Sequence, residues 1–135
     1  MIPTEKLIEL LNTESSLETI LEQIPNVDFV SYLEACMKKQ NMEKKDVIHQ
    51  TNMQENYAYQ ICSGAKKGSK DKIVQLALAM HLDLHDTDNL LSLSDNGKLY
   101  AKVKKDSILI YAIRHRYTVQ KANELLFAHG LDILE

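Results

Sequence analysis

Glycine and proline are scarce in this chain, which has four glycines and two prolines among 135 residues. The tight turns between the strands of a sheet depend on these two residue types. A fold with many strands is therefore disfavoured, and we expect an all-α fold. Disorder is not expected either, because leucine, isoleucine, valine and methionine recur throughout the chain.

Long apolar runs and paired cysteines are missing as well. The longest apolar run, residues 108–113, is far shorter than the ~20 residues that span a membrane, so no membrane partner is expected. The two cysteines, Cys36 and Cys62, form no Cys-x-x-Cys pair, which excludes a disulfide framework and gives no sign of a zinc site. We expect buried or free thiols in the reducing cytoplasm, with no cofactor and no metal.

The length and composition are those of one ordinary globular domain, with 44% hydrophobic and 26% charged residues. The net charge of −3 is spread unevenly. Residues 1–27 hold five glutamates and one lysine, for a net charge of −4, and residues 83–97 also carry −4. Residues 28–82 carry +2 and residues 98–135 carry +3. The modest total therefore conceals two basic segments that alternate with acidic ones.

Apolar residues recur at helical spacing along nearly the whole chain. The pattern predicts short helices over residues 5–11, 17–24, 28–40, 43–50, 54–63, 70–80, 86–93, 105–115 and 118–129. Helix starts are predicted where a polar side chain can accept from the first turn, at Ser15, Asp28, Ser69, and Asp86 or Thr87. Gly64 and Gly130 follow helix ends. In the helix after Ser69, the residues expected to form an inward face are Ile73, Leu76, Ala77 and Met80.

The most informative stretch is residues 43–64, where two short helices flank the turn Thr51-Asn52-Met53. This is the layout of a helix-turn-helix, whose second helix enters the major groove of DNA. The second helix has two faces. Its apolar side is formed by Met53, Ala58 and Ile61. Its polar side consists of Gln54, Glu55, Asn56, Tyr59, Gln60 and Ser63.

At these residues the sequence resembles the Cro and lambda-repressor-like helix-turn-helix family, also called the xenobiotic-response-element family. The matching text runs from Met42 to Gly64, continues from Lys70 to Met80 and includes Leu90 and Leu91. The resemblance implies an all-α protein in three parts. These are an acidic N-terminal helical arm over residues 1–27, a five-helix DNA-binding domain over 28–97 and a two-helix C-terminal extension over 98–135.

The resemblance also implies the function of a sequence-specific transcriptional regulator that reads the major groove of double-stranded DNA with helix 54–63. The residues implied to read base edges are Gln54, Glu55, Asn56, Tyr59 and Gln60. The residues implied to contact phosphates are Lys44, Tyr57, Lys66, Lys67 and Lys70. One such domain covers a half-site, so a homodimer is expected.

Several residues depart from the family pattern, among them Ile48, Cys62 and Gly68, and two further departures affect the turn and the reading helix. Asn52 stands where glycine is usual in the turn, and we expect it to adopt the positive φ that asparagine tolerates. Glu55 places a carboxylate at the front of the reading helix, where it repels phosphate but can accept from cytosine N4.

Other functions have weaker sequence signals. A helix-turn-helix module that binds a protein, such as a toxin or a kinase, is the alternative, and the net acidity and Glu55 favour it. The arm or the extension is the expected site of self-association or of a protein partner. The basic residues Lys102, Lys104, Lys105, Arg114 and Arg116 are better explained as a solvated face than as a second DNA contact. No nucleophile with a matching base is present, so we expect no enzyme activity.

Overall fold

The computed structural model describes residues 3–11, 17–22 and 27–135, and within these ranges the regular structure is helical, without strands. The predicted all-α class is confirmed. In these ranges the helices are α1 Thr4–Leu11, α2 Leu17–Glu22, α3 Phe29–Lys39, α4 Lys44–His49, α5 Glu55–Cys62, α6 Lys70–Ala79, α7 Leu84–Leu93, α8 Lys104–Arg114 and α9 Val119–Ala128. The helix start predicted at Ser15 lies outside the described residues. None of the described helices is long and apolar enough to cross a bilayer.

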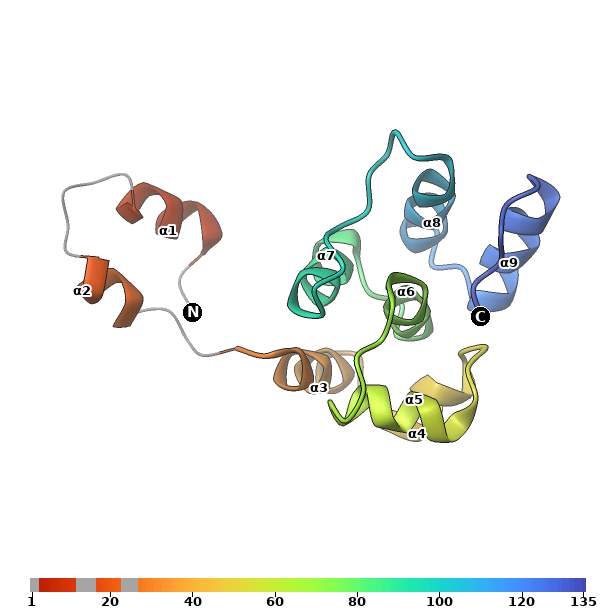
Figure 1. The fold of residues 1–135 in the computed structure, drawn as a ribbon, viewed down its shortest axis with the longest axis horizontal. Coiled ribbons are helices and arrows are strands. Elements are labelled where there is room, and N and C mark those ends of the chain that lie inside the picture. The colour runs from red at the N-terminus through yellow and green to blue at the C-terminus, as the bar shows by residue number, and fades with distance from the viewer. Residues whose placement is uncertain (1–2, 12–16, 23–26) are drawn as a thin grey trace.

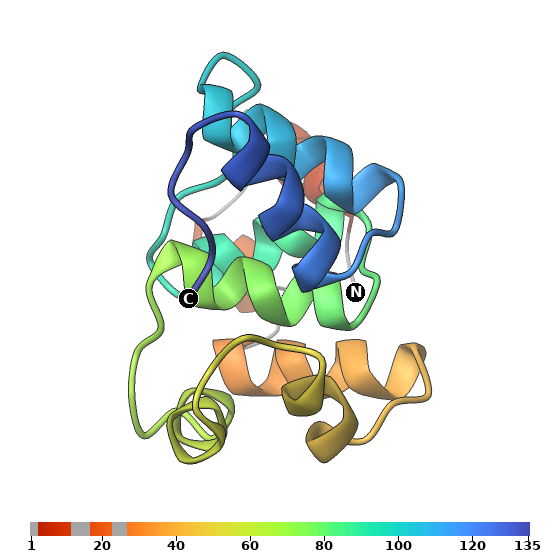
Figure 2. The same ribbon diagram turned by 90° about the vertical axis from the view of Figure 1, so that its right-hand side faces the viewer.

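Helix α6 is the centre of the body. It packs against α4, α7, α8 and α9. In Figure 2 it lies between the α8–α9 pair and a layer formed by α3, α4 and α5. Helices α1 and α2 contact each other and lie at the end of the molecule opposite α9 (Figure 1).

The whole middle of α6, from Ile73 to Ala79, is buried. The expectation of a single inward face was therefore too narrow, because α6 is enclosed on all sides. A helix that is apolar all round is typical of such a position. Its one polar residue in this run, Gln75, is fully buried with the apolar ones.

Helix caps agree with the predictions where the signal is local. Asp28 caps α3, and its carboxylate accepts from the backbone N–H of Ser31 at 2.8 Å. Gly64 follows α5 with a φ of +83°, as expected for a residue just beyond a helix end. Ser69 occupies the N-cap position of α6, but its side chain makes no capping hydrogen bond.

The predicted start of α7 at Asp86 or Thr87 is wrong. The helix begins at Leu84, and the N-cap is Asp83, whose carboxylate accepts from the backbone N–H of Asp86 at 2.8 Å. Asp86 is already within the helix, and its side chain turns toward α3.

Asp86 anchors a polar cluster between α3 and α7. Its two carboxylate oxygens accept from the hydroxyl of Tyr32 at 2.6 Å and from Nζ of Lys39 at 3.1 Å. Asn89 in turn donates to the Tyr32 oxygen at 2.9 Å. Burial acts to raise the pKa of Asp86, but the hydrogen bonds from Tyr32 and Lys39 outweigh it and hold that pKa below the usual value. The carboxylate is therefore charged at neutral pH and links the two helices.

A second set of charges joins α6 to α8. Lys70 pairs with Asp106 at 2.8 Å, and Asp71 pairs with Lys105 at 3.0 Å. The buried carboxylate of Asp106 also accepts from the backbone N–H of Tyr100 at 3.0 Å. The extension over residues 98–135 is thus attached to the centre of the body by ion pairs as well as by apolar packing.

We expect Asp86→Ala to lower the free energy of unfolding by about 2–3 kcal/mol, because the Tyr32 hydroxyl and the Lys39 ammonium lose their acceptor. The lowered pKa makes this contribution full at neutral pH. It is lost as the pH falls below about 4 and through the native pKa of Asp86. Urea unfolding at pH 7 and at pH 3 measures both effects.

The matched control for this substitution is Asp132→Ala, at an exposed aspartate for which the structure gives no ion pair. It should change the free energy of unfolding by no more than about 0.5 kcal/mol. Equal losses in the two variants would contradict the role assigned to the Asp86 cluster.

Candidate nucleic-acid interface

Helix α5 presents one buried face and one exposed face. Ala58, Ile61 and Cys62 are fully buried, whereas Gln54, Glu55, Asn56, Gln60 and Ser63 are exposed and Tyr59 is half-buried. Gln54 occupies the N-cap position, so the helix is one residue shorter at each end than the predicted 54–63. Each predicted base-reading residue thus lies on the same short helix or at its start.

The exposed face is not covered by the rest of the described chain. The structure gives no hydrogen bond or ion pair from the side chains of Gln54, Asn56 or Gln60 to another described residue. Figure 1 places the arm and helix α9 away from the outer side of α5. The amide groups of this face are therefore available to an external donor or acceptor.

The turn between α4 and α5 is held by α6. The backbone N–H of Asn52 donates to Oε1 of the buried Gln75 at 2.6 Å. The hydroxyl of Thr51 donates to the carbonyl of Ile48 at 2.7 Å and closes the end of α4. The expectation of a positive φ at Asn52 was wrong, since the described non-glycine residues with positive φ are Asn41, His81, Asp95 and Arg116.

The C-terminal segment also reaches this turn. The Asn52 side-chain amide donates to the carbonyl of Leu134 at 3.1 Å, and Asn123 on α9 donates to the same carbonyl at 3.0 Å. Asn123 also accepts from the backbone N–H of Leu134 at 2.7 Å. Asn52 therefore links the turn between α4 and α5 to the C-terminal segment, a role that the sequence pattern alone did not indicate.

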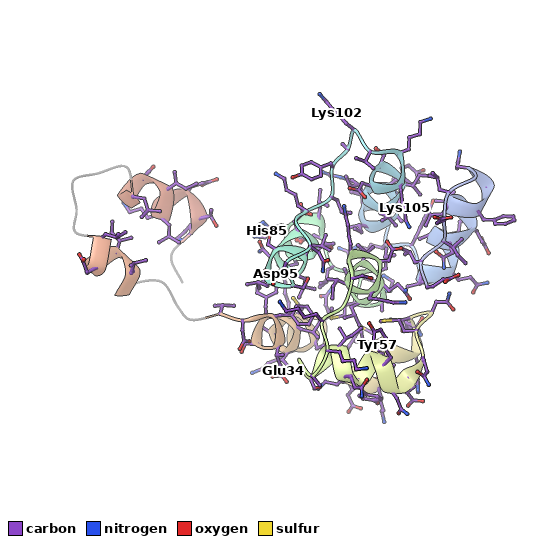
Figure 3. All side chains as sticks on the ribbon, viewed as in Figure 1. Glu34, Tyr57, His85, Asp95, Lys102 and Lys105 are labelled. Carbon is purple, nitrogen blue, oxygen red and sulfur yellow. The ribbon has the colours of Figure 1, made fainter. Side chains whose placement is uncertain are left out.

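Lysines surround the amino end of α6 and the loop before it. Lys66 and Lys72 both lie over the Tyr57 ring, with Nζ 5.8 Å and 5.9 Å from the ring centroid. Figure 3 shows Tyr57 on the part of the body that carries α5. The two ammonium groups form a small basic surface over Tyr57 of α5, and Nζ of Lys72 also donates to the carbonyl of Glu135.

The other lysines predicted to contact phosphate differ in how strongly they are paired with acidic residues. Lys67 pairs with Asp95 at 2.8 Å, and both side chains are largely exposed, so this pair costs little to open. Lys70 pairs with Asp106, whose side chain is only 7% exposed, so its withdrawal would leave a buried carboxylate without a partner. Lys44, at the start of α4, is half-buried. Lys70 is therefore the predicted contact with the strongest competing interaction.

The thiols have no reactive character. Burial raises the pKa of Cys62 to about 11, against an opposing effect of the Lys44 charge. Burial and the Asp86 charge raise the pKa of Cys36 to about 11. Both thiols are free, buried and protonated at neutral pH. Among the described residues, no three His, Cys, Asp or Glu side chains lie close enough together to hold a metal ion.

Comparison with known proteins gives no further guide, since no protein-family model, no curated protein and no solved structure matches the chain.

The hydrogen bond from Asn52 to Gln75 can be tested by substitution. We expect Gln75→Ala to speed hydrogen exchange at the Asn52 amide and to lower the free energy of unfolding by about 2–4 kcal/mol. The change removes the acceptor of a partly buried N–H and leaves a cavity between α6 and the α4–α5 turn. Hydrogen exchange followed by NMR measures the first effect, and urea unfolding measures the second.

Gln60→Ala is the control for Gln75→Ala, because it truncates an exposed glutamine on α5. It should leave both the Asn52 exchange rate and the stability nearly unchanged. If exchange at Asn52 stays as slow in Gln75→Ala as in the parent chain, α6 does not hold the turn.

Proposed function

We propose that this protein is a sequence-specific DNA-binding transcriptional regulator that inserts α5 into the major groove. In this proposal α3 to α7 form the five-helix, lambda-repressor-like domain. The observation that carries the proposal is an exposed amide face on α5, uncovered by the described chain and bordered by the lysines around Tyr57. No catalytic step is proposed.

The side chains of this face suit the edges of base pairs. Asn56 and Gln60 are exposed amides, which can donate to N7 or accept from N6 of adenine through paired atoms. Glu55 is exposed in the first turn, where the helix dipole favours a carboxylate, and it can accept from cytosine N4. Gln54 and Tyr59 border these three. Helix α5 has eight residues, so it extends about 12 Å and fits within one groove crossing.

The residues proposed to contact phosphate differ in the free energy needed to release each charge from its present ion pair. Lys66 has no acidic partner among the described residues and is the first candidate. Lys67 can exchange Asp95 for a phosphate at little cost, since both groups are solvated. Lys44 is the half-buried first residue of α4, and the ring of Tyr57 lies beside the Lys66 ammonium group. Lys70 contributes by fixing the start of α6 through Asp106, and its charge is the least available to DNA.

The alternative is a helix-turn-helix module that binds a protein partner. The net charge of −3 and the commitment of Lys67 and Lys70 to internal ion pairs favour it. The two functions differ in their response to salt, because phosphate contacts release condensed counterions and protein contacts do not.

We expect the chain to bind the DNA upstream of its own gene with an affinity that falls steeply as salt rises. The slope of log K against log salt should be about −0.9 per phosphate contacted. Lys66→Gln should make this slope shallower by about 0.9, because one contact is lost. Fluorescence anisotropy from 50 to 200 mM salt, roughly the range over which phosphate contacts weaken, measures the slope.

Arg114→Gln is the control for Lys66→Gln. It removes the same charge from an exposed residue of α8, which α6 separates from α5 (Figure 2). Its salt slope should equal that of the parent chain. Absence of binding to any duplex at low salt would exclude DNA binding and favour the protein-binding alternative.

Base reading is tested at the two amides. We expect Asn56→Ala and Gln60→Ala each to cost about 1–3 kcal/mol of discrimination between the specific site and a scrambled duplex, because a paired contact to adenine is lost. Competition gel shifts measure the ratio of the two affinities. Gln120→Ala, at an exposed amide on α9, should retain the ratio. If both α5 variants bind the specific site as selectively as the parent chain, other residues read the sequence.

A further inference from the structure

The outer side of the α8–α9 pair carries a continuous apolar groove. One hollow of about 400 Å³ is lined by Ser107, Ile108, Tyr111, Leu125 and His129. An adjoining hollow of about 390 Å³ shares Ser107, Ile108 and His129 and continues to Leu131. Tyr111 is 50% exposed at this groove, so its ring is only partly packed by the chain itself.

The groove has basic residues at one end. Lys102 and Lys104 line the second hollow, and the structure gives neither an ion pair with a described residue. Figure 3 shows Lys102 at a tip of the body, on the side away from Tyr57. No aspartate or glutamate lines either hollow. The groove therefore suits an apolar segment that carries negative charge.

The arm has this chemistry. Ile8, Leu11, Leu17 and Leu21 are each more than half exposed, at 51–54%, and Ile20 is the only buried side chain among the described residues of α1 and α2. Residues 1–27 carry five glutamates and one lysine. Exposing the apolar faces of two short helices to water is unfavourable. Such faces are commonly buried by packing the helix into an apolar groove.

We propose that the arm of one copy of this chain packs into the α8–α9 groove of a second copy, and that the exchange is reciprocal. The apolar faces of α1 and α2 cover Ile108 and Tyr111, and the arm's glutamates face Lys102 and Lys104. A second copy is the occupant because α1 and α2 lie at the opposite end of the molecule from α9 (Figure 1). Two equivalent arm–groove contacts close a two-fold dimer in which both arms and both grooves are occupied.

The proposed dimer requires the exposed apolar residues of the arm and the opposite charges of arm and groove, and it does not require DNA binding. The dimer leaves α5 free, since the groove lies on α8 and α9 and α6 separates these helices from α5 (Figure 2). Dimerisation measured without DNA therefore tests it separately from the proposed function.

Sedimentation equilibrium of the full chain without DNA should show a dimer at micromolar concentrations. The arm variant Leu17→Asp/Leu21→Asp and the groove variant Tyr111→Asp should each weaken dimerisation by about tenfold or more, because a charge meets an apolar surface. Phe127→Asp is the matched control, at an aromatic residue of α9 that is 78% exposed and lies outside both hollows. It should dimerise like the parent chain.

Mixing the two defective variants provides the sharper test. In the mixed dimer, the intact arm of the groove variant meets the intact groove of the arm variant, so one complete contact forms. The mixture should dimerise more tightly than either variant alone. The inference is overturned by a monomeric parent chain, by a dimer that survives both substitutions, by loss of the dimer in Phe127→Asp, or by a mixture that stays monomeric.

Discussion

The complete burial of α6 is the constraint on which the rest of the body depends. Its residues from Ile73 to Ala79 are buried, and α6 packs against α4, α7, α8 and α9, so none of these four helices can shift without disturbing this core. The single polar side chain in that run, Gln75, accepts from the backbone N–H of Asn52 and so holds the turn between α4 and α5. Its Nε2 atom is buried without a hydrogen-bond partner among the described residues.

The packing around α6 also determines which charged side chains remain available to an external ligand. Lys70 and Asp71 begin α6 and pair with Asp106 and Lys105 on α8, so these four residues serve the attachment of the extension. Lys66 lies in the loop just before α6, and its ammonium group lies over the ring of Tyr57. In the basic surface over Tyr57, Lys66 therefore has no acidic partner among the described residues, whereas Lys72 also donates to the carbonyl of Glu135.

Sequence reasoning succeeded where the cause was local. The all-α class, the cap at Asp28 and the helix end at Gly64 depend on residues within a few positions of one another. It failed where a distant partner decided the outcome. Asp86 resembles a helix start, but Tyr32 on α3 draws its carboxylate into the helix interface.

The candidate site shows the same division. The two faces of α5 follow from its periodicity, whereas the turn at Asn52 depends on Gln75, 23 positions away. A lone amide within the apolar run of α6 was the available signal for that contact. The ion pair that occupies Lys70 could not be inferred, because Asp106 comes near it only through the packing of α8 on α6.

In the proposed complex, the exposed face of α5 enters duplex DNA while the core around α6 stays intact. An NMR titration of the labelled full chain with a duplex distinguishes this complex from other modes of binding. We expect shifts concentrated at the amides of residues 54–63 and 66–67, with the amides of α6 nearly unchanged. Shifts confined to α8 and α9, or none at all with a duplex at low salt, would contradict it.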